Sequence, residues 1–170
     1  MRAQIATGLI VMGLAAPAPP AAADTLRGKS YIIELSSSQY ASGYGEYLLP
    51  PLLSVLDRSG MRAKNGPGAD VVVNIVTDSD VGRWTGAGAG REWIYTISAT
   101  VGLSPESHVI PPDGTPAFGI RAVLETPNPD RQDEWDCLIA LAARTAIANA
   151  NPGKTGVRRT DGQSCLRGGG

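Results

Sequence analysis

The pattern of hydrophobic and polar residues changes its period several times along this chain. Four segments show the every-second-residue alternation, or the nearly continuous β-branched run, that is typical of β-strands. The clearest alternation runs through a segment in which Trp93 and Tyr95 begin an apolar face and the intervening positions are mostly small or hydroxylated. The four predicted strands are Lys29–Ser36, Ala69–Thr77, Arg91–Ser104 and Ala117–Thr126.

Two other segments place their hydrophobic residues at helical spacing. The first is Glu46–Ser59, which contains Pro50 and Pro51. Because proline is tolerated only in the first turn of a helix, we expect this helix to begin near Tyr47–Leu49 and to stop at Gly60. The second is Arg131–Ala150, for which Asp130 is the predicted N-cap.

The element order is therefore β-α-β-β-β-α. The first two strands flank a helix, so we expect them to be parallel with a right-handed crossover, and the last three can form an antiparallel meander. The predicted fold is an α+β two-layer sandwich, with a four-stranded mixed sheet and both helices on one face. Residues 24–150 are expected to form this single domain.

Residues 1–23 have the composition of a secretory signal peptide. Arg2 is the only charged residue before Asp24, and an apolar run from Ile5 to Ala16 leads to a segment that ends in three alanines. The apolar run is too short for a bilayer-spanning helix, which needs about 20 residues. We expect cleavage near Ala23 and a mature protein in the periplasm or secreted, without a transmembrane segment.

The two cysteines, Cys137 and Cys165, both follow the leader. Two cysteines in an exported chain most simply form one disulfide, and a metal pair is the weaker alternative because the spacing is not that of a zinc site. Cys137 is expected on the side of its helix opposite the apolar stripe. A Cys137–Cys165 bond would then hold the polar tail, residues 151–170, across the outer face of the last helix.

Charge and motifs exclude several classes of function. The formal net charge is −1 and no long basic run is present, which argues against nucleic acid as the partner. The G-x-G-x-G run Gly86–Gly90 precedes a strand, whereas a dinucleotide fingerprint precedes a helix. Asp78–Asp80 does not continue as a calcium loop, and Ser36–Ser38 does not have the pattern of a nucleophilic serine. His108 is the only histidine in the sequence. We expect no catalytic, cofactor or metal site, and interpret Asp133 and Asp136 as helix-start charges.

Two surfaces are candidates for binding a partner. The first is a loop in which Arg83, Trp84 and Arg91 bracket the glycine-rich run; alternatively, Trp84 folds back over the edge of the sheet. The second is the sheet face left uncovered by the helices; alternatively, this is an ordinary solvated face. Its residues are Ile94, Thr96, Ser98, Thr100, Arg121 and Val123.

The element order, with the segment Ala69–Val73 after the crossover helix, resembles small bacterial envelope domains. These are the penicillin-binding-protein activator lipoproteins and the amino-terminal domain of the Tol–Pal translocation protein. The resemblance implies an architecture and transfers no functional residue. We therefore expect an exported, non-enzymatic accessory or binding protein of the cell envelope, which contacts an envelope protein or itself through the open sheet face. The alternative is a small secreted enzyme, such as a hydrolase, without a recognisable motif.

Overall fold

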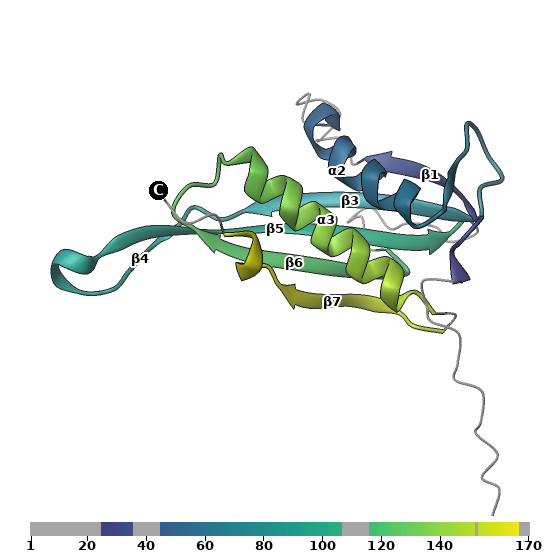
Figure 1. The fold of residues 1–170 in the computed structure, drawn as a ribbon. Helices are drawn as coiled ribbons and strands as arrows, with labels where there is room; N and C mark the ends of the chain where they lie inside the picture. The colour runs from purple at the N-terminus through teal and green to yellow at the C-terminus, as the bar shows by residue number, and fades with distance from the viewer. Residues whose placement is uncertain (1–24, 36–44, 107–115, 152, 167–170) are drawn as a thin grey trace, which may run out of the picture.

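The computed structural model describes residues 25–35, 45–106, 116–151 and 153–166 (Figure 1). Their secondary structure begins with strand β1 and ends with the short 3₁₀ turn η3. In chain order the elements are β1 (Ser30–Leu35), α2 (Gly45–Arg58), β2 (Arg62–Ala63), β3 (Val71–Ser79), β4 (Arg83–Thr85), the 3₁₀ turn η2 (Gly88–Gly90), β5 (Glu92–Pro105), β6 (Phe118–Thr126), α3 (Gln132–Asn149), β7 (Gly156–Asp161) and η3 (Gln163–Cys165).

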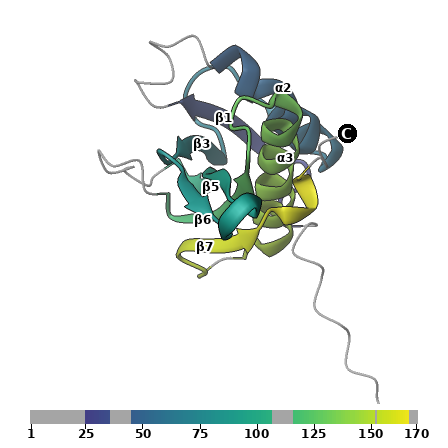
Figure 2. The same cartoon turned by 90° about the vertical axis from the view of Figure 1, so that its left-hand side faces the viewer.

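The strands form one mixed sheet in the order β2-β1-β3-β5-β6-β7, and β4 pairs with β5 beyond the end of this row. β1 is parallel to β2 and β3, the strands β3, β5 and β6 form an antiparallel meander, and β7 is parallel to β6. Both helices lie on the same side of the sheet (Figure 2). The predicted α+β class and mixed sheet are confirmed. The predicted strand number is wrong, because the described residues form seven strands and not four.

The three strands that the sequence did not reveal lack a hydrophobic alternation. β2 is only two residues long, and β4 continues the line of β3 after an interruption. β7 has the sequence Gly-Val-Arg-Arg-Thr-Asp and is exposed along most of its length. It is held at the edge of the sheet by parallel pairing with β6. An edge strand can be polar because backbone hydrogen bonds hold it on one side, and charged side chains protect its other side from further pairing.

The core lies between the helices and one face of the sheet. The odd-numbered residues of β3 and β5 turn toward the helices, as the alternation of β5 predicts. The helices contribute a leucine-rich stripe from α2 and a stripe of alanine, isoleucine and leucine from α3. The largest fully buried side chains include Leu52, Leu56, Val73, Ile75, Ile97, Val101, Leu124, Leu138 and Ile139. Because these side chains are buried, the hydrophobic pattern of the sequence predicts the four strands β1, β3, β5 and β6.

Helix α2 begins earlier than predicted, at Gly45, so that Pro50 and Pro51 lie in its second turn. Pro51 has no N–H to donate to the carbonyl oxygen of Tyr47, four residues earlier. The side chain of Gln132 at the start of α3 donates to this oxygen instead, at 3.5 Å. The two helix starts are therefore in contact.

Helix α3 also differs from its predicted start. Arg131 occupies the N-cap position without a side-chain capping bond, and Asp130 instead donates its backbone N–H to the side chain of Asn128. The first turn contains Glu134, which is fully buried and pairs with Arg131 at 3.2 Å. Within the described ranges, no helix has the length and apolar character needed to cross a membrane.

Asp70 joins the beginning of β1 to the beginning of β3. Its carboxylate accepts hydrogen bonds from the backbone N–H and the hydroxyl group of Ser30, both at 2.8 Å, and pairs with Lys29 at 3.2 Å. The bonds from Ser30 lower the pKa of Asp70 to about 2, with Lys29 contributing. This contact fixes the register of the parallel pair.

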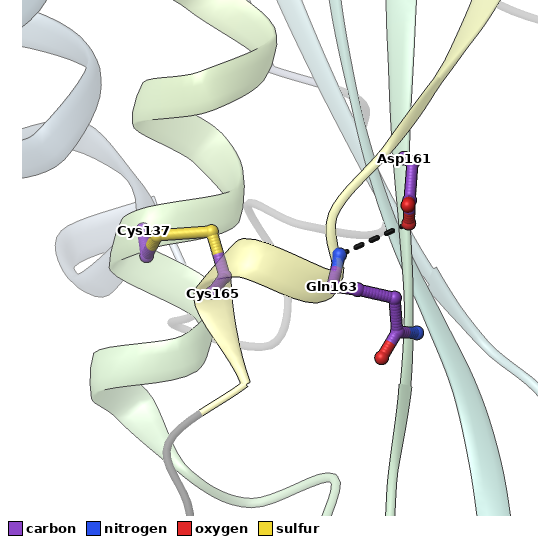
Figure 3. Close-up of a disulfide and its surroundings, with 4 residues drawn as sticks. All are labelled: Cys137, Asp161, Gln163 and Cys165. Carbon is purple, nitrogen blue, oxygen red and sulfur yellow. Dashed lines mark hydrogen bonds between the residues drawn. A yellow bond between two sulfur atoms is a disulfide. The ribbon is translucent and has the colours of Figure 1, made fainter.

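The predicted disulfide between Cys137 and Cys165 is present, and its two Cα atoms lie 5.5 Å apart (Figure 3). The tail does not simply lie across the helix as expected, because residues 156–161 form β7 and only η3 crosses to α3. At this crossing the N–H of Gly162 donates to the carbonyl oxygen of Val123 at 2.8 Å. A side chain on Gly162 would collide with Leu138, so glycine allows the tail to pass between sheet and helix.

Candidate functional site

The hairpin formed by β3 and β5 is interrupted by a β-bulge. β3 and β5 pair regularly as far as Ser79 opposite Ile97, and pairing resumes with β4 at Arg83 opposite Ile94. Residues 80–82 on one strand therefore oppose only Tyr95 and Thr96 on the other. One extra residue on one strand is the definition of a bulge, which bends and twists the strand that contains it.

The bulge determines which way Trp84 faces. It brings Trp84 directly opposite Trp93. In the register of the β3 pairing, Trp84 would instead lie opposite Glu92, on the other face of the hairpin, because a one-residue shift reverses every side chain. Trp93 and Tyr95 belong to the side of β5 that turns toward the helices, so Trp84 also lies on the helix side.

Beyond the bulge the hairpin projects from the body as an arm, here defined as residues 80–95 (Figure 1). The pairing of β5 with β6 ends at Tyr95 opposite Thr126. The arm extends past the start of α3, so no helix of the described structure covers it (Figure 1). Its helix-side surface, the aromatic face, consists of Trp84, Trp93, Tyr95 and Arg91.

The three rings of the aromatic face pack edge to face. The Trp84 and Trp93 centroids are 5.2 Å apart with an interplanar angle of 83°, and those of Trp93 and Tyr95 are 6.4 Å apart with an angle of 74°. Trp93 and Tyr95 are half-buried, whereas Trp84 is 56% exposed. The packing leaves Trp84 as the ring most available to a partner.

Arg91 lies against this ring. Its guanidinium carbon is 4.9 Å from the centroid of Trp84, a distance at which the cation is attracted to the ring. Among the described residues Arg91 has no ion pair with a carboxylate. Its N–H donors are therefore available to an anionic group that approaches Trp84.

The predicted loop site of Arg83, Trp84 and Arg91 is divided between the two faces of the arm. Arg83 lies on the opposite face, where it donates to the hydroxyl oxygen of Thr96 at 2.9 Å and pairs with Glu125. Only Trp84 and Arg91 form one unit. The alternative placement of Trp84, folded over the edge of the sheet, does not describe it either, since its contact is with Trp93 on the facing strand.

Asp80 holds the bulge at the base of the arm. One of its carboxylate oxygens accepts from the backbone N–H of Thr96 at 2.8 Å and from that of Gly82 at 2.9 Å. The hydrogen bond from Thr96 is the main cause of a lowered pKa of Asp80, and the bond from Gly82 and the charge of Arg83 act in the same direction. The ionised carboxylate therefore stabilises the bulge.

Acid is expected to loosen the arm through Asp80. Because the pKa is lowered in the folded state, the stabilising contribution is complete above the ordinary Asp value of about 4 and is lost as the pH falls through the folded value. Amide exchange at Thr96 should therefore accelerate relative to the body of β5 as the pH is lowered. Asp80→Asn keeps the accepting oxygen without titrating, so its ratio of exchange rates should be flat over this range. An equal acid response in that variant would assign the effect to another group.

The second predicted surface is a real face of the sheet, but it is less open than expected. Ile94, Thr96, Ser98, Thr100, Arg121 and Val123 all lie on the side away from the helices, since Ser98 pairs with Val123 and Thr100 with Arg121. Ser98 and Val123 are buried, at 3% and 6% exposed. Arg121 donates to Ser98 at 3.1 Å and pairs with Asp78 at 3.2 Å. Arg121, Ser98 and Asp78 are thus engaged with one another.

The far end of the same face is closed by close packing. Asn74 is buried opposite Gly102, and Pro116 lies over both Gly102 and Gly119. A side chain at Gly102 would collide with both Asn74 and Pro116. This leaves the arm as the more accessible of the two predicted surfaces.

The described residues contain no group of three or more histidine, cysteine, aspartate or glutamate side chains arranged to hold a metal ion. Asp78 and Asp80, considered above as a possible calcium loop, are bonded to Arg121 and to the bulge. Ser36–Ser38 and His108 lie outside the described residues.

The sequence did not single out Trp93 and Tyr95 as site residues, because their alternation continues that of the core. The available signal was strand length. β5 has 14 residues and its neighbour β6 has nine, so the first residues of β5 must extend beyond the sheet that would otherwise bury them.

Comparison with known proteins gives no family. The chain matches no protein-family model and no curated protein. Among solved structures it is similar to a minor lipoprotein from Acinetobacter baumannii, with a TM-score of 0.35 and 14% identity over 71% of this chain and 84% of the other. It is also similar to a neuraminyllactose-binding hemagglutinin homolog from Helicobacter pylori, with a TM-score of 0.32 and 15% identity over 72% and 83%. These likenesses are too remote to support an argument about function.

Proposed function

We propose that this chain is an exported, non-enzymatic binding or accessory protein of a bacterial cell envelope, and that it contacts its partner through the aromatic face of the arm. The observation that carries the proposal is the exposed Trp84 with Arg91 against it, on an arm that projects beyond the helices. Tryptophan and arginine are the residues most enriched among those that dominate binding energy at protein interfaces.

Export is supported by the leader composition of residues 1–23 and by the disulfide. Disulfides persist in oxidising compartments such as the periplasm. The bond between Cys137 and Cys165 also ties η3 and the end of β7 to α3, so an oxidising compartment, which preserves the bond, stabilises the fold. Mass measurement of the exported chain should give a mature protein that begins near Asp24 and contains no free thiol.

Crosslinking in the periplasm tests the binding role. Wild type should give a reproducible adduct, and Trp84→Ala should lose most of it, because the variant removes the exposed ring without touching the core. Val157→Ala is the matched control, since Val157 is also an exposed hydrophobic residue, at 42%, but lies on β7 away from the arm. Adducts that are equally strong in wild type and Trp84→Ala would contradict the proposal.

A further inference from the structure

The arm has a free sheet edge on the side that β6 occupies in the body of the molecule. Pairing of β5 with β6 ends at Tyr95, and Figure 1 shows the arm extending past the end of β6. Beyond this point the residues Glu92–Ile94 of β5 pair with β4 on one side. No strand of the described residues pairs with them on the other side. This edge therefore continues the line of β6 without a strand in it.

The backbone groups of Trp93 point to the free edge. At the base of the arm the N–H of Asp80 donates to the carbonyl oxygen of Thr96 at 3.0 Å, and the N–H of Thr96 donates to the carboxylate of Asp80. Both backbone groups of Thr96 are thus directed toward the strand segment that leads into β4. Because this direction alternates along a strand, those of Ile94 are directed to β4 and those of Trp93 away from it. An added strand can therefore bond to the N–H and C=O of Trp93.

The other edges of the sheet are less suited to an added strand. At one end β7 carries Arg158 and Arg159 at exposed positions, and at the other end β2 has only two residues. The outer edge of β4 follows the bulge, which bends and twists it. The free edge of β5 has regular pairing on its inner side and no proline between Glu92 and Tyr95. It is the edge on which pairing is least obstructed.

The side chains along this edge indicate what the added strand must carry. Every second residue of such a strand lies on the same side as the aromatic face. The residue opposite Trp93 meets the ring cluster, since Trp84 packs against Trp93 at 5.2 Å, and a large apolar side chain is favoured there. The residue opposite Arg91 meets a guanidinium that has no ion pair among the described residues. A carboxylate is favoured at that position.

We infer that the partner docks through an extended segment that adds to the free edge of β5 as an antiparallel strand, and that this segment carries a large apolar residue followed two positions later by aspartate or glutamate. The inference rests on the proposed function, because it names the segment that the aromatic face receives. The segment takes the place that β6 has in the body, and β6 is antiparallel to β5. In this direction the residue opposite Trp93 precedes the residue opposite Arg91.

Strand addition is a recognised way to bind a peptide, in which backbone hydrogen bonds supply affinity and alternate side chains supply specificity. Other occupants fit less well. A partner that extended over the edge with side chains of another shape would bury the N–H and C=O of Trp93 unpaired, which is unfavourable. The rings stand edge to face, at 83° and 74°, and do not offer the parallel faces on which sugars or bases stack. A strand satisfies the backbone and the rings together.

Selection from a library of random displayed peptides, with the mature disulfide-bonded chain immobilised, tests the side-chain part of the inference. Wild type should enrich peptides in which an aromatic or large aliphatic residue is followed two positions later by aspartate or glutamate. Arg91→Glu reverses the charge of the arm and should enrich lysine or arginine at that second position. Val157→Ala is the matched control on β7 and should select the same peptides as wild type.

The backbone of a selected peptide tests the strand itself. N-methylation of the residue opposite Trp93 removes the N–H that donates to β5 and should weaken binding at least about tenfold. N-methylation of the next residue, whose N–H points away from β5, should have little effect. In the complex the amide exchange of Trp93 should slow, and that of Ile94, which is directed to β4, is the reference.

Three results would overturn the inference. They are the enrichment of no common pattern by wild type, the selection of the same acidic peptides by Arg91→Glu, and equal tolerance of N-methylation at both positions. None of them decides the proposed function, which depends on the periplasmic adduct that Trp84→Ala loses. That adduct, found without a selected peptide, would leave the function standing and show that the partner presents a folded surface to the arm.

Discussion

Replacing Cys137 and Cys165 together by alanine is expected to lower the free energy of unfolding by about 3–4 kcal/mol, the chain-entropy value for this loop length. The two residues are 28 positions apart, and the bond connects α3 to η3, which directly follows β7. Without it β7 is held mainly by its pairing with β6, because most of its side chains are exposed. Loss of the bond should therefore affect both global stability and the local opening of this edge.

Chemical denaturation with and without reductant measures the effect. Reduction of wild type should reproduce the loss, and reductant should not change the double alanine variant. Ser164→Ala, at the exposed position next to Cys165, is the control and should stay within about 0.5 kcal/mol of wild type. Amide exchange of β7 should accelerate more than that of β5. A double variant as stable as wild type would contradict this expectation and show that β7 and η3 are held in place without the disulfide.

The second large effect is expected from Gly82→Ala, at the bulge. Gly82 has φ of +78°, in the left-handed region, where a residue with a side chain is disfavoured by about 1–2 kcal/mol. A Cβ atom here would also collide with the indole ring of Trp93. The bulge cannot then keep its conformation, and the register that places Trp84 opposite Trp93 is lost.

Gly82→Ala should therefore abolish both the tryptophan contact and partner binding while the body remains folded. The loss of the contact is seen as a weaker near-ultraviolet circular dichroism signal from tryptophan. Gly90→Ala is the matched control, because Gly90 is also on the arm, has no positive φ and has open space around its Cβ position. If both variants behave alike, the arm is simply intolerant of change and the bulge has no special role.

The parts of the fold that the sequence predicted are those in which a side chain is buried on one side. The alternation of β5 and the helical stripe of α3 follow directly from the core, and both appear within one or two residues of their expected limits. β7 could not be found in this way, because Arg158 and Arg159 carry no hydrophobic signal and the strand is defined by backbone pairing. Pro50 and Pro51 misplaced the start of α2, since the sequence does not show that Gln132 replaces a lost backbone donor.

The candidate site was only partly accessible to sequence reasoning. The sequence grouped Arg83, Trp84 and Arg91 as one loop, because a loop pattern does not separate its residues into two faces. The bulge is what places Arg83 on one face of the arm and Trp84 with Arg91 on the other. It depends on the carboxylate of Asp80 and on the conformation of Gly82. Neither residue is distinguished locally from those of an ordinary turn, so only the observed strand register identifies their role.

The claim that the arm is the docking element is tested most directly by a photo-crosslinking amino acid placed at position 90 in the exported protein of living cells, because Gly90 is on the arm, has open space around its Cβ position and leaves Trp84 in place. Position 58, at the exposed end of α2, serves as the comparison. Crosslinking from position 90 should give one defined adduct, and position 58 should not give it. No adduct from position 90, or the same adducts from both positions, would contradict the account.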